Sequence, residues 1–155
     1  MVVSMPPTVW GPFFWHTMHL VALGYPNAPS YQEKKAAKEF YESFAFLIPC
    51  PVCKTHYEET LKEMPLTVSL DSRKDLFRWT VEIHNKVNTM LHKQTLTESD
   101  ALDYYTKLGA YGRSPVWTPE DFQNVQYESY LKGAGVSFLL FGTIGLGLWW
   151  LTKHD

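Results

Sequence analysis

Two cysteines spaced Cys-x-x-Cys are the residues of this 155-residue chain best suited to redox or metal chemistry. Cys50 and Cys53 are the only cysteines in the chain, and Pro49 and Pro51 flank the first of them. This spacing is typical of a redox disulfide or of half a zinc site. Attachment of haem is excluded, because Lys54 occupies the position where that motif requires histidine.

The position of the cysteine pair at the start of a predicted helix favours a reactive disulfide. Residues three apart in a helix have Cα atoms about 5.5 Å apart, which is within the range of a disulfide. The helix dipole and the free backbone N–H groups at this end stabilise a thiolate, and Lys54 adds positive charge. A structural role is disfavoured, because the bond would close too small a loop to constrain the unfolded chain much.

The residues alone also leave a zinc site as an alternative. Cys50, Cys53 and His56 are possible zinc ligands, with His84 or His92 as the fourth. His84 and His92 are eight residues apart, which makes a poor second pair of ligands. We therefore predict that no residue of the chain ligates a metal ion. The alternative prediction for the function is a membrane-anchored adaptor protein that binds zinc or thiols and catalyses no reaction.

In each of two further segments, aromatic or polar side chains are spaced so that they lie on the same face of a helix. Trp15 and His19 are four residues apart, and so are His84 and Asn88. The second pair shares its face with apolar residues, and polar groups in such a position need partners. We interpret the second segment as facing a polar ligand, whereas the first on its own would be a core helix with an aromatic face.

The elements that position these residues are predicted to be helices, because alternation typical of strands is scarce. Capping signals and prolines place the helices at about residues 8–24, from Ser30 to 47, from the cysteines to 64, from Asp71 to 92, and from Thr97 to 108. The predicted fold class is all-α, a four-helix bundle plus a short fifth helix. Another helix is expected to start at residues 118–121.

An uncharged stretch at residues 133–151 is predicted to be a C-terminal transmembrane helix. As a helix it would span roughly 28 Å, which is close to the hydrocarbon thickness of a bilayer. We therefore expect a helical bundle domain at residues 1–112, a juxtamembrane loop and helix at 113–132, and this single-pass anchor. Such an anchor, inserted after synthesis, would leave the bundle facing the cytosol.

Composition narrows the possible ligands. The formal net charge of −2 gives no reason to expect nucleic acid as a partner. Aromatic residues make up 15% of the chain, which suits either core packing or the walls of a pocket for a flat ligand.

Together, three segments resemble the Erv/ALR family of FAD-dependent sulfhydryl oxidases, and the chain is similar to the viral branch of that family. The segments are Trp15…His19…Tyr25-Pro26, Ile48-Pro49-Cys50-Pro51-Val52-Cys53 and His84-Asn85-Lys86-Val87-Asn88. The resemblance implies a helical bundle that binds FAD between its helices and forms a homodimer. The residues it assigns to FAD are Gly11, Trp15, His19, Tyr25, His84, Asn85, Val87 and Asn88.

The resemblance further implies an enzyme that oxidises thiols of a substrate or carrier protein. Electrons would pass from those thiols through the Cys50–Cys53 disulfide to FAD and then to O2, giving H2O2. Cys50 would form the mixed disulfide with the partner, and Cys53 would lie beside the flavin. Many cellular members carry a second cysteine pair, which this chain lacks, so a partner must reach Cys50 directly. A cytosol-facing oxidase would suit a host cytoplasm or virion membrane if the protein is viral.

Overall fold

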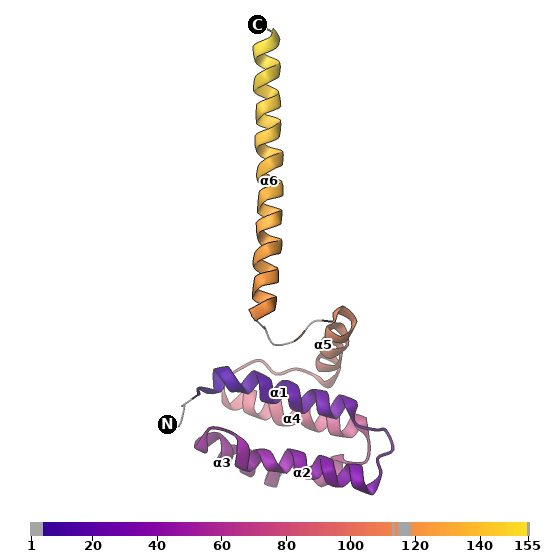
Figure 1. Cartoon of the computed structure of the whole chain (residues 1–155). Coiled ribbons are helices and arrows are strands. Elements are labelled where there is room, and N and C mark those ends of the chain that lie inside the picture. Colours follow the sequence, from indigo (N-terminus) through magenta and orange to yellow (C-terminus); the bar gives the residue numbers. More distant parts are fainter. Residues whose placement is uncertain (1–4, 113, 115–118, 155) are drawn as a thin grey trace. The chain divides into compact units, whose positions relative to one another are not determined.

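The computed structural model describes residues 5–112, 114 and 119–154. The elements are α1 (Pro7–Gly24), α2 (Tyr31–Leu47), α3 (Pro51–Glu63), the 3₁₀ helix η1 (Leu66–Ser69), α4 (Arg73–Met90), α5 (Glu98–Tyr111) and α6 (Pro119–His154). Every regular element in this described part of the chain is a helix (Figure 1). The predicted all-α fold class is confirmed.

Two of the predicted capping signals start helices where the sequence placed them. The Ser30 hydroxyl accepts a hydrogen bond from the Glu33 N–H, and the Glu33 carboxylate accepts one from the Ser30 N–H. This capping box opens α2 by satisfying two backbone donors that lack helical partners. The Thr97 hydroxyl accepts from the Asp100 N–H and opens α5 in a similar way.

Helix α4 has slightly different ends from those predicted. Ser72, and not Asp71, is its N-cap residue, because the Ser72 hydroxyl accepts a hydrogen bond from the Asp75 N–H. Asp71 forms an ion pair with Lys34 of α2 instead. At the other end the helix stops at Met90, two residues before the predicted end.

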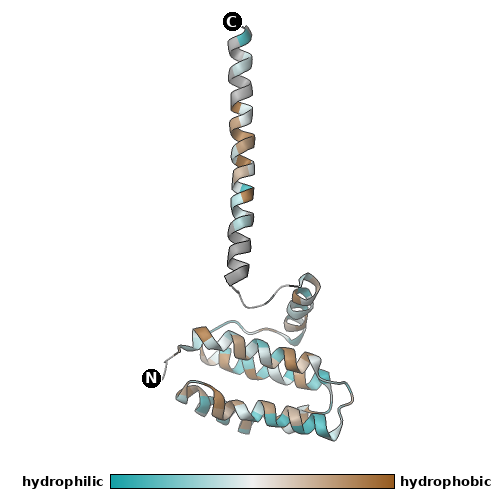
Figure 2. Ribbon diagram, viewed as in Figure 1, coloured by the Kyte–Doolittle hydropathy of each residue, from teal (hydrophilic) through white to brown (hydrophobic). Residues whose placement is uncertain are grey.

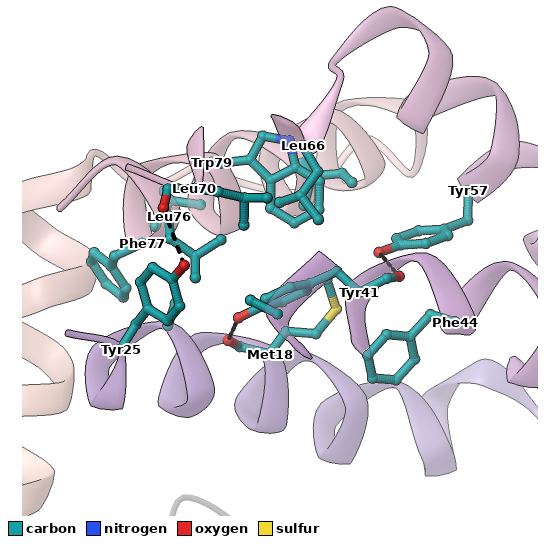
Figure 3. Close-up of a cluster of buried hydrophobic side chains, with 14 of the residues drawn as sticks. Met18, Tyr25, Tyr41, Phe44, Tyr57, Leu66, Leu70, Leu76, Phe77 and Trp79 are labelled. Carbon is teal, nitrogen blue, oxygen red and sulfur yellow. Dashed lines mark hydrogen bonds between the residues drawn. The ribbon is translucent and has the colours of Figure 1, made fainter. Parts of the chain in front are cut away.

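Helices α1 and α4 lie side by side, and α2 packs against α3 (Figure 1). Hydrogen bonds from three buried tyrosines connect the parts of this core (Figure 3). The Tyr41 hydroxyl donates to the Met18 carbonyl of α1, and the Tyr57 hydroxyl of α3 donates to the Tyr41 carbonyl. The Tyr25 hydroxyl donates to the Leu70 carbonyl. Each hydroxyl is satisfied inside the core, so the rings stabilise the packing without leaving an unpaired polar group.

The predicted short fifth helix is present as α5, which packs on α4. Its buried face carries Ala101 and Tyr105. Arg78 of α4 donates to the carboxylate of Glu98 at the start of α5, with 3.0 Å between Nε and Oε2. These contacts hold α5 next to the helix that carries the segment around His84.

The chain divides into two compact units, Met1–Pro115 and Val116–Asp155. The described residues of the second unit form the single helix α6, where the sequence predicted a juxtamembrane helix followed by an anchor. Hydrophobic residues gather in the central part of α6 (Figure 2).

The predicted transmembrane helix is not supported. Among the described residues, no helix combines the length and the apolar character that crossing a membrane requires. Glycine, serine and threonine interrupt the apolar residues of the stretch at 133–151. The side chains of residues 145–148 and 151, which belong to the predicted span, lie outside the described part of the chain.

Candidate active site

Cys50 and Cys53 form a disulfide at the N-terminus of α3, with Cα atoms 5.2 Å apart. Cys50 is the N-cap residue, and its Sγ accepts a hydrogen bond from the Cys53 N–H at 3.2 Å. Pro51 follows in the first turn, where its missing N–H removes no helical hydrogen bond. The predicted disulfide at a helix start is confirmed.

The zinc alternative finds no support in this arrangement. Both cysteines of the chain are used in the disulfide, so neither is a free thiolate ligand. Within the described ranges, no group of three or more histidine, cysteine or acidic side chains is arranged to hold a metal ion.

The two cysteines of the disulfide have different surroundings. Cys53 lines a cavity of about 920 Å³ within the first unit, whereas Cys50 is not part of its wall. Phe46, Leu47 and Val52, which are near Cys50 in the sequence, are 74%, 67% and 64% exposed. The disulfide therefore has one member on the cavity wall, while the other, which is itself partly buried, lies between the exposed Pro49 and Pro51.

The cavity is large enough for a substantial organic ligand and has flat walls. Its lining comes mainly from α1 and α4, with further residues from α2, α3 and α5. Trp15 of α1 stacks on His84 of α4, with ring centroids 4.1 Å apart and an interplanar angle of 6°. Aromatic and apolar surfaces of this kind pack well against a planar ring system.

All but one of the residues predicted to bind the cofactor line this cavity: Gly11, Trp15, His19, His84, Asn85, Val87 and Asn88. Tyr25 is the exception. It is buried in the core, 6% exposed, where its hydroxyl donates to the Leu70 carbonyl. The structure therefore brings the two helical motifs together and places Tyr25 away from the cavity.

His19 and His84 join α1 to α4 at the cavity wall. His19 Nε2 lies 3.0 Å from His84 Nδ1, and His19 Nδ1 lies 2.8 Å from Thr80 Oγ1. Burial, followed by the charges of His84 and His16, lowers the pKa of His19 to about 3. Burial, followed by the charges of His16 and Lys93, lowers the pKa of His84 to about 4. Both rings are neutral at pH 7 and act as hydrogen-bonding groups.

The two amide side chains of the His84 segment have different environments. Asn85 Nδ2 donates to the Leu96 carbonyl at 2.7 Å, and Asn85 Oδ1 accepts from the Leu96 N–H at 3.0 Å. Asn85 therefore fixes the loop that follows α4 as well as lining the cavity. The Asn88 amide forms no hydrogen bond with any described residue, so it is available to a ligand.

Several residues that the sequence did not single out also line the cavity: Trp10, His16, Lys93, Tyr104 and Tyr105. Lys93 has no ion-pair partner in the part of the chain that the structure describes, so its charge is available to an anionic ligand. Trp10 directly precedes the predicted Gly11 in the same aromatic segment, and this position is a signal that points to it. Lys93 follows the end of α4, where side-chain direction cannot be read from helical spacing.

The chain is a helical bundle whose disulfide lies between the protein surface and an aromatic cavity. These features define a thiol–disulfide redox protein with a cofactor site. Residues 12–106 match the model of the Erv1 / Alr family, and the chain belongs to this family. The resemblance based on the three motifs is confirmed.

Individual relatives agree with this assignment. The chain is 38% identical over 104 residues to a probable FAD-linked sulfhydryl oxidase of Acanthamoeba polyphaga mimivirus, covering 66% of this chain and 73% of that protein. It is 35% identical over 96 residues to the FAD-linked sulfhydryl oxidase of African swine fever virus, covering 62% and 79%. The crystal structure of the yeast Erv1 core superposes with a TM-score of 0.58 at 33% identity, covering 63% of this chain and 81% of that one.

Proposed function

We propose that this protein is an FAD-linked sulfhydryl oxidase that forms disulfide bonds in partner proteins and delivers the electrons to O2, giving H2O2. The observation that carries the proposal is the placement of Cys53 on the cavity wall while Cys50 lies outside it. A disulfide in this position exchanges with thiols on one side and faces a cofactor on the other. The two viral relatives named above are described as a probable FAD-linked sulfhydryl oxidase and an FAD-linked sulfhydryl oxidase.

The chemistry of the cavity wall fits FAD. Trp15 and His84 offer flat surfaces to a planar ring system, and Lys93 offers a cation to phosphate oxygens. The Asn88 amide can pair with a hydroxyl or a base. Trp10, also on the wall, has a buried Nε1–H without a partner, a group that native proteins rarely leave unsatisfied. Bound FAD supplies a two-electron acceptor that is reoxidised by O2.

The protein's own chemistry is thiol–disulfide exchange. A substrate thiolate attacks Cys50 Sγ, the Cys50–Cys53 bond breaks, and Cys53 leaves as a thiolate. Cys53 lies in the first turn of α3, so the helix N-terminus stabilises that thiolate. The second substrate thiol then attacks the mixed disulfide, which releases the oxidised substrate and leaves Cys50 reduced. The substrate has lost two electrons and two protons, and the enzyme's cysteine pair has gained the electrons.

A substrate or carrier protein reaches Cys50 directly, because the chain has no other cysteine to relay electrons. This requirement restricts partners to proteins whose thiols are accessible enough to touch the surface around Cys50.

The active form is a homodimer in this proposal. Val9, Phe13 and Leu20 are each about half exposed, and their spacing of four and seven residues puts them on one face of α1. A second copy of the chain would remove this apolar stripe from water. Sedimentation tests it: Phe13→Glu should shift the protein toward monomer, and Val68→Glu on the exposed η1 should not.

The decisive experiment measures flavin content and oxygen consumption of the purified full chain. We expect about one FAD per chain and oxygen uptake with dithiothreitol as the electron donor. Cys50→Ser and Cys53→Ser should each abolish turnover while the FAD content is retained. A chain that takes up no FAD and consumes no oxygen when FAD is supplied contradicts the proposal.

A further inference from the structure

A continuous chain of hydrogen bonds runs from the backbone of α4 through two histidines to the cavity. Thr80 Oγ1 lies 2.7 Å from the Phe77 carbonyl oxygen. Thr80 Oγ1 also lies 2.8 Å from His19 Nδ1, and His19 Nε2 lies 3.0 Å from His84 Nδ1. Thr80 is fully buried and does not line the cavity, so it acts on a ligand only through the two rings.

The direction of each hydrogen bond follows from the first one. A carbonyl oxygen accepts only, so two oxygens 2.7 Å apart require the Thr80 hydrogen between them. The Thr80 oxygen must then accept from His19 Nδ1–H. A neutral imidazole has one N–H, and in His19 that hydrogen is on Nδ1, so His19 Nε2 can only accept. His84 Nδ1 must therefore carry a hydrogen, which it donates to His19 Nε2.

This order leaves His84 Nε2 as an unprotonated acceptor. That nitrogen has no partner among the described residues, and it is not one of the polar side-chain atoms sealed from solvent. His84 lines the cavity, and Trp15 covers a face of its ring and leaves the edge free.

We propose that Thr80 is a positioning residue whose hydroxyl holds the N–H of both His19 and His84 on Nδ1, so that His84 offers Nε2 to the cofactor as a hydrogen-bond acceptor. The group that meets Nε2 must then be an O–H or N–H donor of the bound FAD. The identity of that ligand rests on the proposed function, whereas the protonation pattern of the two rings does not.

Nitrogen-15 NMR of the full chain labelled on histidine measures the pattern directly, with and without FAD. We expect both His19 and His84 as neutral Nδ1–H tautomers in each sample, with signals assigned by His19→Gln and His84→Gln. In Thr80→Val the His19 Nδ1–H loses its acceptor, so both hydrogens should move to Nε2. Thr80→Ser keeps a hydroxyl and should keep the wild-type pattern. Either ring in the Nε2–H form in the wild type overturns the proposal.

Affinity for FAD supplies the second measurement. Thr80→Val should weaken FAD binding by about tenfold, because a donor on His84 Nε2 then faces a donor on the ligand. Thr80→Ser should restore it, and Thr60→Val, which removes another buried threonine hydroxyl, should leave it unchanged.

The remaining outcomes separate the possible failures. Weaker binding in Thr80→Val without a change of tautomer assigns Thr80 a merely structural role and overturns the proposal, as does a tautomer change with unaltered affinity. If Thr80→Val does not fold, the wild-type spectrum still decides the ring pattern. A wild-type chain that binds no FAD refutes the proposed function, while the spectrum of the FAD-free chain still tests the hydrogen positions.

Discussion

Trp15 and His84 stack face to face, with ring centroids 4.1 Å apart and an interplanar angle of 6°. The two residues come from α1 and α4, the helices that carry two of the three sequence motifs. His84 cannot turn freely in this stack, because His19 holds its Nδ1 at 3.0 Å. The stack therefore presents a fixed aromatic wall to the cavity and ties the two helices together.

Replacing Trp15 should weaken both the fold and the cofactor site. In Trp15→Ala the aromatic pair is lost, and we expect the free energy of unfolding to fall by about 1–2 kcal/mol. Affinity for FAD should fall at least about tenfold, because His84 loses the ring that fixes it. Trp15→Phe keeps a ring and should recover most of both losses. Urea titration and flavin fluorescence measure the two effects.

Tyr111→Ala serves as the control for Trp15, since Tyr111 is an aromatic residue on α5 that is 73% exposed. It should change neither stability nor affinity appreciably. Equal affinity for FAD in wild type and Trp15→Ala would show that the stack is not part of the cofactor site.

Lys93 should recognise the phosphates of FAD. It lines the cavity, and its positive charge reaches far enough to lower the pKa of His84. Lys93→Gln should weaken FAD binding by about tenfold, since charge-assisted hydrogen bonds to phosphate are among the strong ones, and should reduce its dependence on salt. Riboflavin, which has no phosphate, should bind wild type and variant alike. Equilibrium dialysis at two salt concentrations measures both ligands.

Lys107→Gln is the matched control for Lys93, because Lys107 pairs with Asp103 on the surface of α5. Binding of FAD should be unchanged in that variant. A loss of riboflavin affinity as large as the loss of FAD affinity in Lys93→Gln would place the lysine at the ring system instead of the phosphates.

The helices and the faces of the motifs were predictable because they depend on local spacing. Ser30 with Glu33 marks a helix start by itself, and four-residue spacing puts His84 and Asn88 on one side of a helix. The His84 segment was therefore expected to face a ligand. Spacing alone predicted a core helix for the Trp15 segment, and only the family resemblance assigned it to the cofactor. Both segments line the cavity.

Partners that come from distant parts of the chain were not predictable in this way. Thr80 is 61 residues from His19, and nothing in the local pattern says that its hydroxyl meets that ring. Asn85 was expected to bind the cofactor, but its amide also pairs with the backbone of Leu96, whose path depends on the loop after α4. Tyr25 was expected at the site because it belongs to a motif, yet packing places it in the core.

His92 should be replaceable by glycine with a gain in stability. It follows α4 with a φ of 53°, and the His92 and Lys93 N–H groups donate to the Thr89 and Asn88 carbonyls. This is the left-handed helix ending that glycine adopts without strain. His92→Gly should raise the free energy of unfolding by about 0.5–1 kcal/mol, as measured by urea titration.

His92→Ala separates backbone strain from the loss of the imidazole. Alanine lacks the ring but keeps the Cβ that disfavours a positive φ, so it should give no gain. A destabilising His92→Gly would mean that the imidazole makes a favourable contact large enough to outweigh the strain.

Stability should fall as the solution is acidified below about pH 6.5. Burial lowers the pKa of His19 to about 3 and the pKa of His84 to about 4, whereas unfolded histidines titrate near 6.5. Between these values the unfolded chain binds more protons than the folded chain, so the free energy of unfolding rises with pH. Each ring contributes up to about 1.4 kcal/mol per pH unit, and the contribution levels off above pH 6.5.

Urea titrations between pH 5 and 7.5 measure the slope of the free energy of unfolding against pH. This range is chosen because the carboxylates are largely ionised throughout it. The two rings share a hydrogen bond and titrate as a pair, so the slope belongs to both. Removing one member in His19→Gln should reduce it by about half, and the half-buried His16, whose pKa is lowered by burial, adds a smaller part. An unchanged slope in His19→Gln would show that this ring is not held neutral by its burial in the folded chain.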